Sequence, residues 1–430
     1  MIHTSENAPR HYTHPLVFLL LVIPFGAASG FLGVTIVYLL GRSGVDPVTI
    51  AVLTGLSFLP HTFKFLYAPL VDLTLKRKQW YVMACITSAL GIALLGMVPA
   101  TEAGLPWLRI LVVVGNVATA FLSMAVESLM AYNTAPGELG RTAGWFQAGN
   151  LGGSGLGGGL ALVIAENTTL AWLPGVVLAA ACLLAGLAIF YTTEPEPHLP
   201  QLADEVPGAG TTSNPVWRAI RRVFLDLWQV ASSRMGYLGL LICFLPIGSG
   251  AAGSLFPLFA TEWGASAGDV AATSGALSGL LAAFGCMVGG HFCDRMDRKL
   301  AYAVFGLIMS ACAVLMAWAP HTLTMYYVFV LSYGFISGLC FASFTAVTLE
   351  AIGKGAAATK YSIFASLSNT PSAYMGILNS HFYESSGSNA GLYSDAGMGV
   401  AGVLSKLPCA ISSKWVLIEL SPWLVTRKKL

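Results

Sequence analysis

The chain is a series of apolar runs bounded by charged residues or by Gly and Pro. Runs of about 20 residues form helices that cross ~30 Å of hydrocarbon at ~1.5 Å per residue. The first run continues to Leu40, too long for a cleaved signal segment, so we expect it to be retained. The pattern predicts helices in two sets: 16–40, 48–73, 79–98, 107–133, 142–165 and 170–192, then 235–262, 268–293, 300–319, 323–350 and 358–382.

A twelfth run begins near Gly391 but is defective. Lys406, Pro408 and Lys414 interrupt it, and the composition changes after about residue 404. One interpretation is a reading frame lost near Leu404, which leaves a truncated twelfth helix. The other is a short native helix followed by a basic tail.

Residues 193–234 separate the two sets. The segment PGAGTTSNP reads as a flexible linker. From Trp217 to Val230, large apolar residues and Arg residues occupy different helical stripes, which predicts an amphipathic helix in the membrane interface. This helix either tethers two halves or binds lipid or a partner. We therefore expect domains at 1–192 and 235–430, with 193–234 as the linker.

Composition excludes several classes of protein. Hydrophobic residues make up 56% and charged residues 10% of the chain, whereas soluble proteins carry about 25% charged residues. A net charge of +2 provides no basic face for nucleic acid. The eight cysteines show no metal-binding spacing, and the run GGSGLGGG lacks the Lys of a phosphate loop. We expect an all-α membrane protein in the lipid bilayer, monomeric, with no enzymatic activity, metal or cofactor.

The distribution of Lys and Arg predicts the orientation. Once the helices alternate, one side of the membrane receives only Arg42 and Arg109. The positive-inside rule places the other side, with the N-terminus and the 193–234 loop, in the cytoplasm. That side holds Arg10, Lys76, Arg77, Lys78, Arg141, Arg218, Arg221, Arg222, Arg234, Arg295, Arg298, Lys299, Lys354 and Lys360.

An internal repeat relates the two sets. An offset of 222 places Pro24 on Pro246, Gly26 on Gly248, Asp72 on Asp294 and Arg77 on Lys299. Because each unit has six helices, both copies keep the same orientation, with a pseudo-two-fold axis along the membrane normal. The offset stays close farther along, for Glu127 and Glu350, Arg141 and Lys360, and Asn150 and Asn369.

The repeat carries a motif at the cytoplasmic end of its second helix. A small residue allows two helices to approach, and the carboxylate can accept hydrogen bonds from a neighbouring helix N-terminus or basic loop. Such contacts can form in one state and break in another, so we interpret the motif as a gate. The C-terminal copy has Gly290, Asp294, Arg295, Arg298 and Lys299; the N-terminal copy has Asp72, Lys76, Arg77 and Lys78.

This motif resembles the Gly-x-x-x-Asp-Arg/Lys-x-Gly-Arg/Lys-Arg/Lys signature of the major facilitator superfamily. The departures are Ala68 for the first Gly, Leu73 for the basic residue and Asp297 for the second Gly. They predict that the N-terminal copy is the weaker latch. The resemblance implies two six-helix halves around a central cavity, working by rocking alternating access with helices 1, 4, 7 and 10 lining the cavity.

Two further stretches resemble AmpG-like and acetyl-CoA-transporter-like permeases. One is the string from Phe63 to Asp72, FKFLYAPLVD, and the other is TKYSIFASLSNTPSAYMG in the predicted helix 11. This resemblance implies a proton-coupled importer in the bacterial inner membrane, with a muropeptide-, siderophore- or acyl-CoA-like substrate.

Lys64 lies at membrane depth in the second predicted helix. A Lys there costs ~2.5–3.5 kcal/mol on insertion, so we expect it to face a wet cavity or to pair with an acid. His61, one turn away, would titrate near neutral pH. The functional interpretation is a substrate- or anion-binding group; the alternative is a Lys that snorkels to the surface.

Two acids, Glu127 and Glu350, occupy equivalent positions in helices 4 and 10. They either carry the coupling proton or pair with the following cations, Arg141 and Lys360, as part of the inner gate. Buried amides complete the predicted substrate pathway with Lys64 and His61: Asn116, Gln147, Asn150 and Asn369.

Together these features predict a secondary active transporter that imports a modest-sized polar or anionic solute with protons. Two alternatives stay open: an efflux permease, and a non-transporting sensor or assembly factor on the same fold.

Overall fold

The computed structural model describes residues 12–194, 221, 225, 227–228, 231–273, 277–353 and 357–405. Within these ranges every regular element is helical, as the apolar runs predict. Most of the predicted amphipathic helix at 217–230 and the sequence after residue 405 lie outside the described residues, so both predictions stay open.

The first half contains six helical segments in the described residues. Several are interrupted rather than straight. In order they are α1 (Pro15–Gly30) with the π-helical η1 (Phe31–Ile36) and α2 (Val37–Arg42); α3 (Pro47–Thr62) with α4 (Lys64–Leu73); α5 (Arg77–Met97); η2 (Glu102–Gly104) with α6 (Leu105–Asn133); η3 (Pro136–Glu138) with α7 (Leu139–Asn167); and α8 (Leu173–Gly186) with η4 (Leu187–Tyr191).

The second half repeats this order with larger interruptions. Its segments are α11 (Arg234–Phe244) with η5 (Ala251–Ser254), α12 (Phe256–Phe259) and η6 (Ala260–Trp263); α13 (Ala267–Ala272) with α14 (Ser278–Cys293); α15 (Arg298–Trp318); α16 (Leu323–Ile352); α17 (Ala357–Ser386); and α18 (Ser388–Leu404). Seven described stretches are long and apolar enough to span a membrane, and α14 is a shorter apolar helix.

Helix starts follow local chemistry. Asp46 precedes Pro47 and accepts a hydrogen bond from Thr49 N (3.1 Å), which satisfies one of the free N–H groups of α3. Asp297 accepts from Lys299 N (3.0 Å) and Leu300 N (2.9 Å) at the start of α15. The motif's departure at Asp297 is therefore explained by helix capping.

The prediction of one continuous helix over 235–262 is wrong. The chain leaves α11 at Phe244 and turns through Gly248 (φ 59°) and Gly250 (φ 70°). Only glycine adopts such positive φ angles without strain. The apolar run hides the break, because hydrophobicity reports membrane depth and not backbone conformation.

The predicted helix over 48–73 is also divided, because Phe63 separates α3 from α4. In the predicted helix over 268–293, residues 274–276 between α13 and α14 lie outside the described residues. The division at Phe63 follows Pro60, whose backbone carbonyl accepts a hydrogen bond from the Tyr67 hydroxyl (2.6 Å). Proline interrupts helical hydrogen bonds, and here a side chain replaces part of what is lost.

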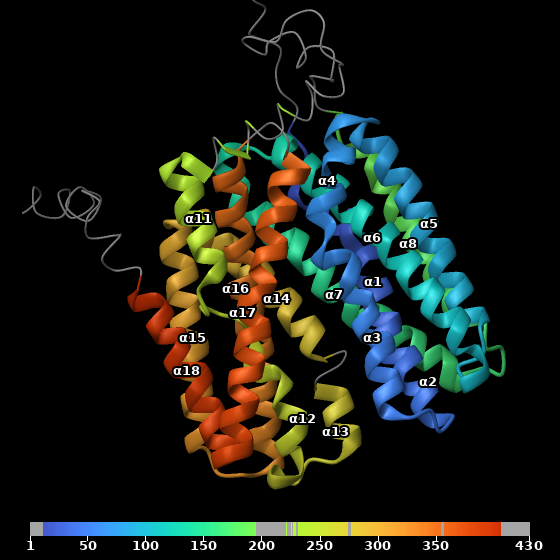
Figure 1. The fold of residues 1–430 in the computed structure, drawn as a ribbon, viewed down its shortest axis with the longest axis vertical. Coiled ribbons are helices and arrows are strands. Elements are labelled where there is room, and N and C mark those ends of the chain that lie inside the picture. The colour runs from blue at the N-terminus through green and yellow to red at the C-terminus, as the bar shows by residue number, and fades with distance from the viewer. Residues whose placement is uncertain are drawn as a thin grey trace, which may run out of the picture.

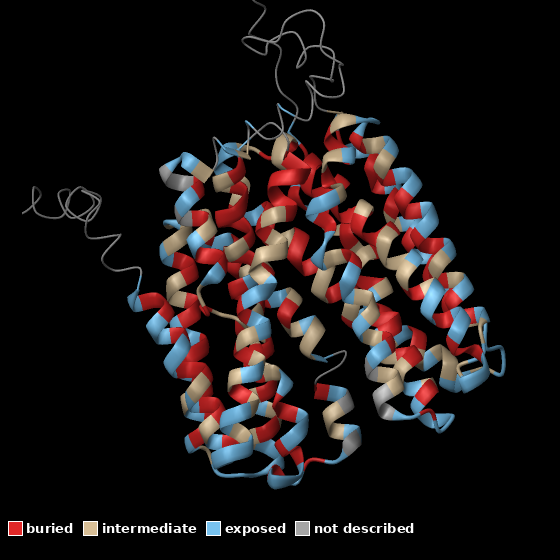
Figure 2. Cartoon of the chain, in the orientation of Figure 1, coloured by how far each residue is buried: buried red, intermediate tan, exposed pale blue. Residues whose placement is uncertain are grey.

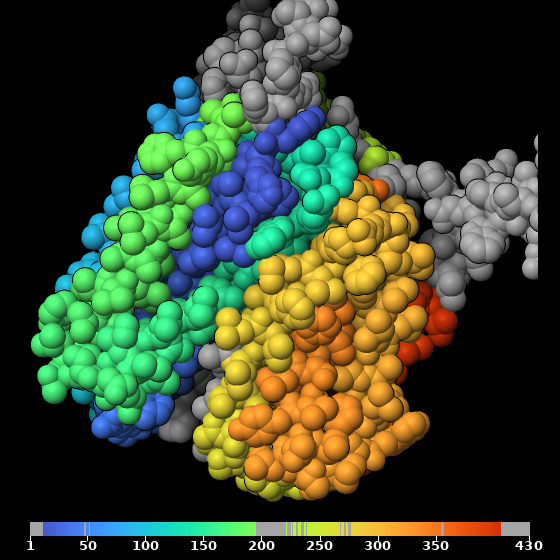
Figure 3. Space-filling view, turned by 180° about the vertical axis from the view of Figure 1, so that it is seen from behind, coloured from blue at the N-terminus to red at the C-terminus, as the bar shows by residue number. Residues whose placement is uncertain are grey.

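The two halves form two lobes (Figure 1). In the space-filling view α7, in teal, lies against α14, in gold, and the lobes separate toward the ends of α2 and α13 (Figure 3). The outer faces are rich in exposed residues (Figure 2). Many of these are large and apolar, such as Leu184, Phe190 and Trp318, as expected of a surface that contacts lipid.

Candidate substrate pathway and gate

The end of the bundle that carries the loops with Lys76, Arg77, Arg295 and Arg298 is called here the basic end, and the opposite end the far end. Asp294 lies at the basic end, directly after α14. Its carboxylate accepts hydrogen bonds from the backbone N–H groups of Gly140 (2.7 Å) and Arg141 (2.9 Å), and from Arg141 Nε (3.3 Å). These N–H groups belong to the first turn of α7, so a carboxylate of one half caps a helix of the other.

Asp72 makes the corresponding contact from the first half. Its carboxylate accepts from Ala358 N (3.3 Å), Thr359 N (2.9 Å) and Thr359 Oγ1 (2.8 Å) at the start of α17. The Asp72 side chain is 2% exposed. The prediction that this copy is the weaker latch has no support in the geometry, because both carboxylates accept three hydrogen bonds across the interface.

Close backbone packing explains the small residue of the motif. A Cβ on Gly290 would lie 2.5 Å from the carbonyl oxygen of Gly140 and 2.8 Å from the Cα of Gly144. Helices α14 and α7 therefore meet through glycines. Ala68, at the equivalent place in α4, is fully buried with its methyl group accommodated, so the seam between α4 and α17 is wider.

The basic residues of the motif have different surroundings. Arg77 is buried, with Nε donating to Ser128 Oγ (3.2 Å) and its guanidinium 5.0 Å from the ring centre of Tyr132. Lys76 and Arg295 are exposed. Of these three cations, Arg77 alone is buried.

Lys64 pairs with an acid, which is one of the two surroundings expected for it. Lys64 Nζ lies 2.8 Å and 3.2 Å from the two carboxylate oxygens of Glu127. The side chains are 7% and 4% exposed. This buried pair joins α4 to α6, and the snorkelling alternative does not describe it.

The predicted pairing of Glu127 and Glu350 with Arg141 and Lys360 is wrong. Arg141 contacts Asp294 and Glu138, and Lys360 Nζ donates to the carbonyl of Ile352 (3.3 Å). Glu350 instead pairs with Arg298 (3.0 Å), in a partly exposed position. Sequence proximity misled the prediction, because cations that follow an acid in the chain lie beyond a helix end and point elsewhere.

A polar layer spans the two halves beside the Lys64–Glu127 pair. Gln147 Nε2 of α7 donates to Thr345 Oγ1 of α16 (2.8 Å), and Asn150 Nδ2 donates to Gln147 Oε1 (3.1 Å). Lys64 Nζ lies 5.8 Å from the ring centre of Tyr361 on α17, a cation–π distance. The layer, defined by these six residues, ties α4, α6 and α7 to α16 and α17.

Three predicted pathway residues lie outside the polar layer. His61 Nε2 is 3.1 Å from Asn116 Oδ1, and the His61 ring packs edge-on against Phe25. Asn369 is exposed on α17, so the prediction that it is a buried pathway amide is wrong.

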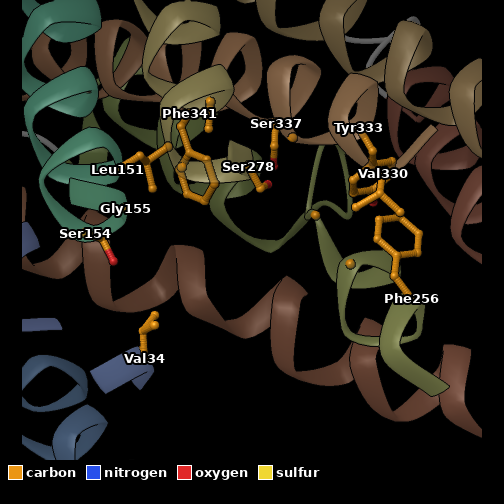
Figure 4. A pocket seen from close by; sticks show the side chains of 15 residues that line it. Val34, Leu151, Ser154, Gly155, Phe256, Ser278, Val330, Tyr333, Ser337 and Phe341 are labelled. Atoms are coloured by element: carbon orange, nitrogen blue, oxygen red, sulfur yellow. The ribbon is translucent and has the colours of Figure 1, made fainter. Parts of the chain in front are cut away.

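A cavity of about 320 Å³ lies between the halves on the far-end side of the polar layer. Along α7 the order from the basic end is gate (Gly140), polar layer (Gln147) and cavity (Leu151, Ser154). Figure 4 shows Val34 and Ser154 opposite Phe256 and Tyr333, with the hydroxyls of Ser278 and Ser337 between apolar side chains.

The cavity lining differs from the prediction in two ways. Its residues come from η1, α7, η5, α12, α14 and α16, so α6, the predicted helix 4, does not contribute. None of the six predicted pathway residues (Lys64, His61, Asn116, Gln147, Asn150 and Asn369) lines it either. Sequence reasoning selected polar residues, whereas most of the wall comes from α7, α14 and α16, and the irregular stretches add Val34, Gly250, Gly253 and Phe256. Non-helical backbone at membrane depth is tolerated where it lines such a cavity.

One buried acid was missed. Asp395 on α18 is 5% exposed and accepts hydrogen bonds from Tyr333 and Asn379. The rule that singled out Lys64, an ionisable residue within an apolar segment, applies to it equally. It was overlooked because its segment was interpreted as defective.

An all-helical membrane protein of two repeated halves, with a central cavity closed at one end by contacts between the halves, has the architecture of a carrier. The family model of the Major Facilitator Superfamily matches residues 18–376. The chain therefore belongs to this superfamily of secondary transporters.

Solved structures show the same fold. The human organic anion transporter MFSD10 (TETRAN) is 17% identical, with a TM-score of 0.67 over 93% of this chain and 99% of that chain. A variant of the E. coli fucose:proton symporter FucP is 16% identical, with a TM-score of 0.68 over 92% and 98%. The proton:xylose symporter XylE, bound to 6-bromo-6-deoxy-D-glucose, is 14% identical, with a TM-score of 0.63 over 91% and 93%.

Proposed function

We propose that this protein imports a modest-sized polar or anionic solute together with protons across the bacterial inner membrane. The observation that carries the proposal is the buried Lys64–Glu127 pair in the layer that closes the cavity. Residues 1–192 and 235–430 act as the two moving halves, and the positive-inside rule puts the N-terminus and the basic end in the cytoplasm. The closed basic end then corresponds to an outward-facing state.

The charge balance of the Lys64–Glu127 pair couples proton binding to solute binding. Protonation of Glu127 leaves the Lys64 ammonium without a counter-charge, and an unpaired buried charge is strongly unfavourable. An anionic group of a solute can replace the lost carboxylate. Proton and solute therefore favour each other's binding, by a coupling of about 1–3 kcal/mol.

Release follows from the position of the polar layer. When Asp294 and Asp72 lose their hydrogen bonds to α7 and α17, the polar layer separates. The contacts that break are those of Gln147 with Thr345 and of Lys64 with Tyr361. Water reaches Glu127 from the cytoplasm and takes up its proton. Glu127 then pairs with Lys64 again and displaces the anionic group of the solute. Re-pairing then resets the carrier.

The volume of the cavity and the resemblance to AmpG-like permeases restrict the class of solute. About 320 Å³ lies at the low end of small-molecule sites, which span about 300–1,000 Å³. The AmpG-like string Phe63–Asp72 contains Lys64 and favours muropeptide-, siderophore- or acyl-CoA-like compounds. Within that set, the cavity favours the smaller members.

Uptake into proteoliposomes tests the proposal. Labelled muropeptides, acetyl-CoA, ferric siderophores and small peptides are offered with an acidic exterior, with and without a protonophore. We expect gradient-dependent uptake of one class, lost in Lys64→Ala and kept in the matched control Arg109→Ala, whose exposed cation lies outside the gating motif. Uptake that persists undiminished after collapse of the gradient would contradict proton coupling, and gradient-driven extrusion from inverted vesicles would contradict import.

A further inference from the structure

Asp395 is a second buried acid in the membrane-spanning part of the protein. It lies about two turns into α18 from Ser388 and is 5% exposed. Oδ2 accepts a hydrogen bond from the Tyr333 hydroxyl (3.0 Å) on α16, and Oδ1 accepts one from Asn379 Nδ2 (3.0 Å) on α17. Three helices of the second half thus meet at one carboxylate.

This carboxylate has no cationic partner among the described residues, unlike Asp72, Glu127, Asp294 and Glu350. The titratable groups around it are Tyr333 and, beside Tyr333, the thiols of Cys312 on α15 and Cys340 on α16. From η5 it meets only backbone, at Ala252. An ionised acid so enclosed at membrane depth is costly, and such residues typically belong to ion pathways.

Asn379 is suited to both charge states of Asp395. Asn379 is fully buried, and its Oδ1 has no hydrogen-bond partner among the described residues. An amide that donates through Nδ2 to a carboxylate can turn and accept, through Oδ1, the O–H of a carboxylic acid. The unpartnered oxygen is thus the acceptor that a protonated Asp395 requires.

Asp395 also connects to the cavity. Tyr333, whose hydroxyl it binds, is part of the cavity wall beside Phe256 (Figure 4). Tyr333 and Asp395 both lie in the parts of their helices that are nearer the far end. The contacts of Asp72 and Asp294 between the halves are at the opposite end. A solute that displaces the Tyr333 ring changes the hydrogen bonding of Asp395.

We infer that Asp395 is a second proton-binding group of the transport cycle, loaded from the far end through the cavity. This inference rests on the proposed proton coupling. A hydronium ion gives its proton to Oδ1 and becomes water, the acid O–H turns to Asn379 Oδ1, and Tyr333 continues to donate to Oδ2. The charges of Lys64 and Glu127 cancel each other. Ionised Asp395 therefore leaves these three buried residues with one net negative charge, which the bound proton removes.

Infrared difference spectroscopy tests proton binding without a substrate. The full chain in lipid bilayers is titrated between about pH 5 and about pH 8, a range above the ordinary carboxyl values, and the C=O band of protonated carboxylic acids is followed. We expect a titrating band that Asp395→Asn removes and Asp395→Glu restores. Glu127→Gln is the matched control, a buried acid that keeps a cationic neighbour, and it should leave this band in place.

A merely structural role makes a different prediction. Tyr333→Phe removes a hydroxyl that donates more strongly to a charged carboxylate than to the acid, so the midpoint of the band should move to higher pH, whereas a packing role would change stability and leave the midpoint unmoved. This variant also serves if Asp395→Asn fails to fold. A band unchanged in Asp395→Asn, or one that responds to Na⁺ and not to pH, overturns the inference.

Transport separates this inference from the proposed function. With the solute found in the uptake screen, we expect Asp395→Asn to reduce stimulation by the pH gradient at least about tenfold and to weaken the response to membrane potential. Gradient-driven uptake that is unaltered in Asp395→Asn overturns the role of Asp395 and leaves proton coupling standing. Uptake that ignores the gradient in the wild type overturns both.

Discussion

Asp72 and Asp294 make equivalent contacts from opposite halves, each capping the first turn of a helix in the other half. Asp72 binds the start of α17 and Asp294 the start of α7. The two acids are 222 residues apart, and their targets Gly140 and Thr359 are 219 apart. The two acids therefore make matching contacts between the halves, and under the predicted gating role loss of either should open the same end.

We expect Asp294→Asn and Asp72→Asn to shift the protein toward the state open at the basic end. Each substitution removes charge-assisted hydrogen bonds worth about 1.5–3 kcal/mol, which corresponds to at least a tenfold change in population. Spin labels at Gly137 and Leu300, both exposed, report the separation by pulsed electron resonance. An unchanged distance distribution in both variants would refute the latch.

The Lys64–Glu127 pair should show strong coupling in a double-mutant cycle. Lys64→Met alone leaves a buried carboxylate unpaired and should cost about 3–5 kcal/mol. Lys64→Met with Glu127→Gln should recover most of that loss, measured by thermal unfolding in detergent. Glu350→Gln, at the partly exposed pair with Arg298, is the control and should cost no more than about 1 kcal/mol. Additive losses in the cycle would show that the two side chains act independently.

Gly290→Ala should weaken the seam between α14 and α7. The new methyl group would lie 2.5 Å from the carbonyl oxygen of Gly140, and overpacking of this kind costs about 1–3 kcal/mol. Gly376→Ala on α17, where nothing lies within 4 Å, is the matched control and should be neutral or slightly stabilising. Equal melting temperatures for the two variants would count against close packing at the seam.

Gly248→Ala should disturb the turn that leads to the cavity-lining residues Gly250 and Gly253. Gly248 has a φ of 59°, and its Cβ would meet Cys340 Sγ at 2.6 Å. A left-handed conformation costs an alanine about 1–2 kcal/mol. Gly115→Ala on α6, where nothing lies within 4 Å and the glycine does not line the cavity, is the control. We expect uptake to fall in the first variant and to persist in the second; full uptake by Gly248→Ala would show that the turn is dispensable.

Acid pH should loosen the far-end start of α13. The Ser266 hydroxyl, followed by the Tyr327 hydroxyl, holds the pKa of Asp269 below its ordinary value. Because the folded pKa is lowered, the stabilisation is complete above about pH 4, the unfolded value, and is lost as the pH falls through the folded one. Asp269→Asn should therefore flatten the acid limb of stability in unfolding measurements from about pH 3 to about pH 7.

Hydrophobic pattern and charge were sufficient to predict an all-helical membrane protein of two repeated halves, but not the breaks within its helices. Apolar length fixes which segments span the membrane, because lipid accepts only backbone that is internally hydrogen-bonded. The repeat of Asp72 on Asp294 and the motif around them predicted a gate, and in the structure both acids accept hydrogen bonds from helix starts of the opposite half. Lys64 stood out because a Lys at membrane depth needs a partner or water.

Only the tertiary structure decided which charged residues pair with each other. Glu127 and Glu350 are sequence equivalents, yet one pairs with Lys64 in the interior and the other with Arg298 near the surface. The cavity wall includes Gly250 and Phe256, which follow the backbone break after α11 that the apolar run hides. Hydrophobicity measures the free energy of transferring a residue from water to lipid. Each residue contributes this free energy independently of its neighbours in the fold. Ion pairing, cavity shape and the isolation of Asp395 depend on which helices meet, and that is a property of the packed bundle.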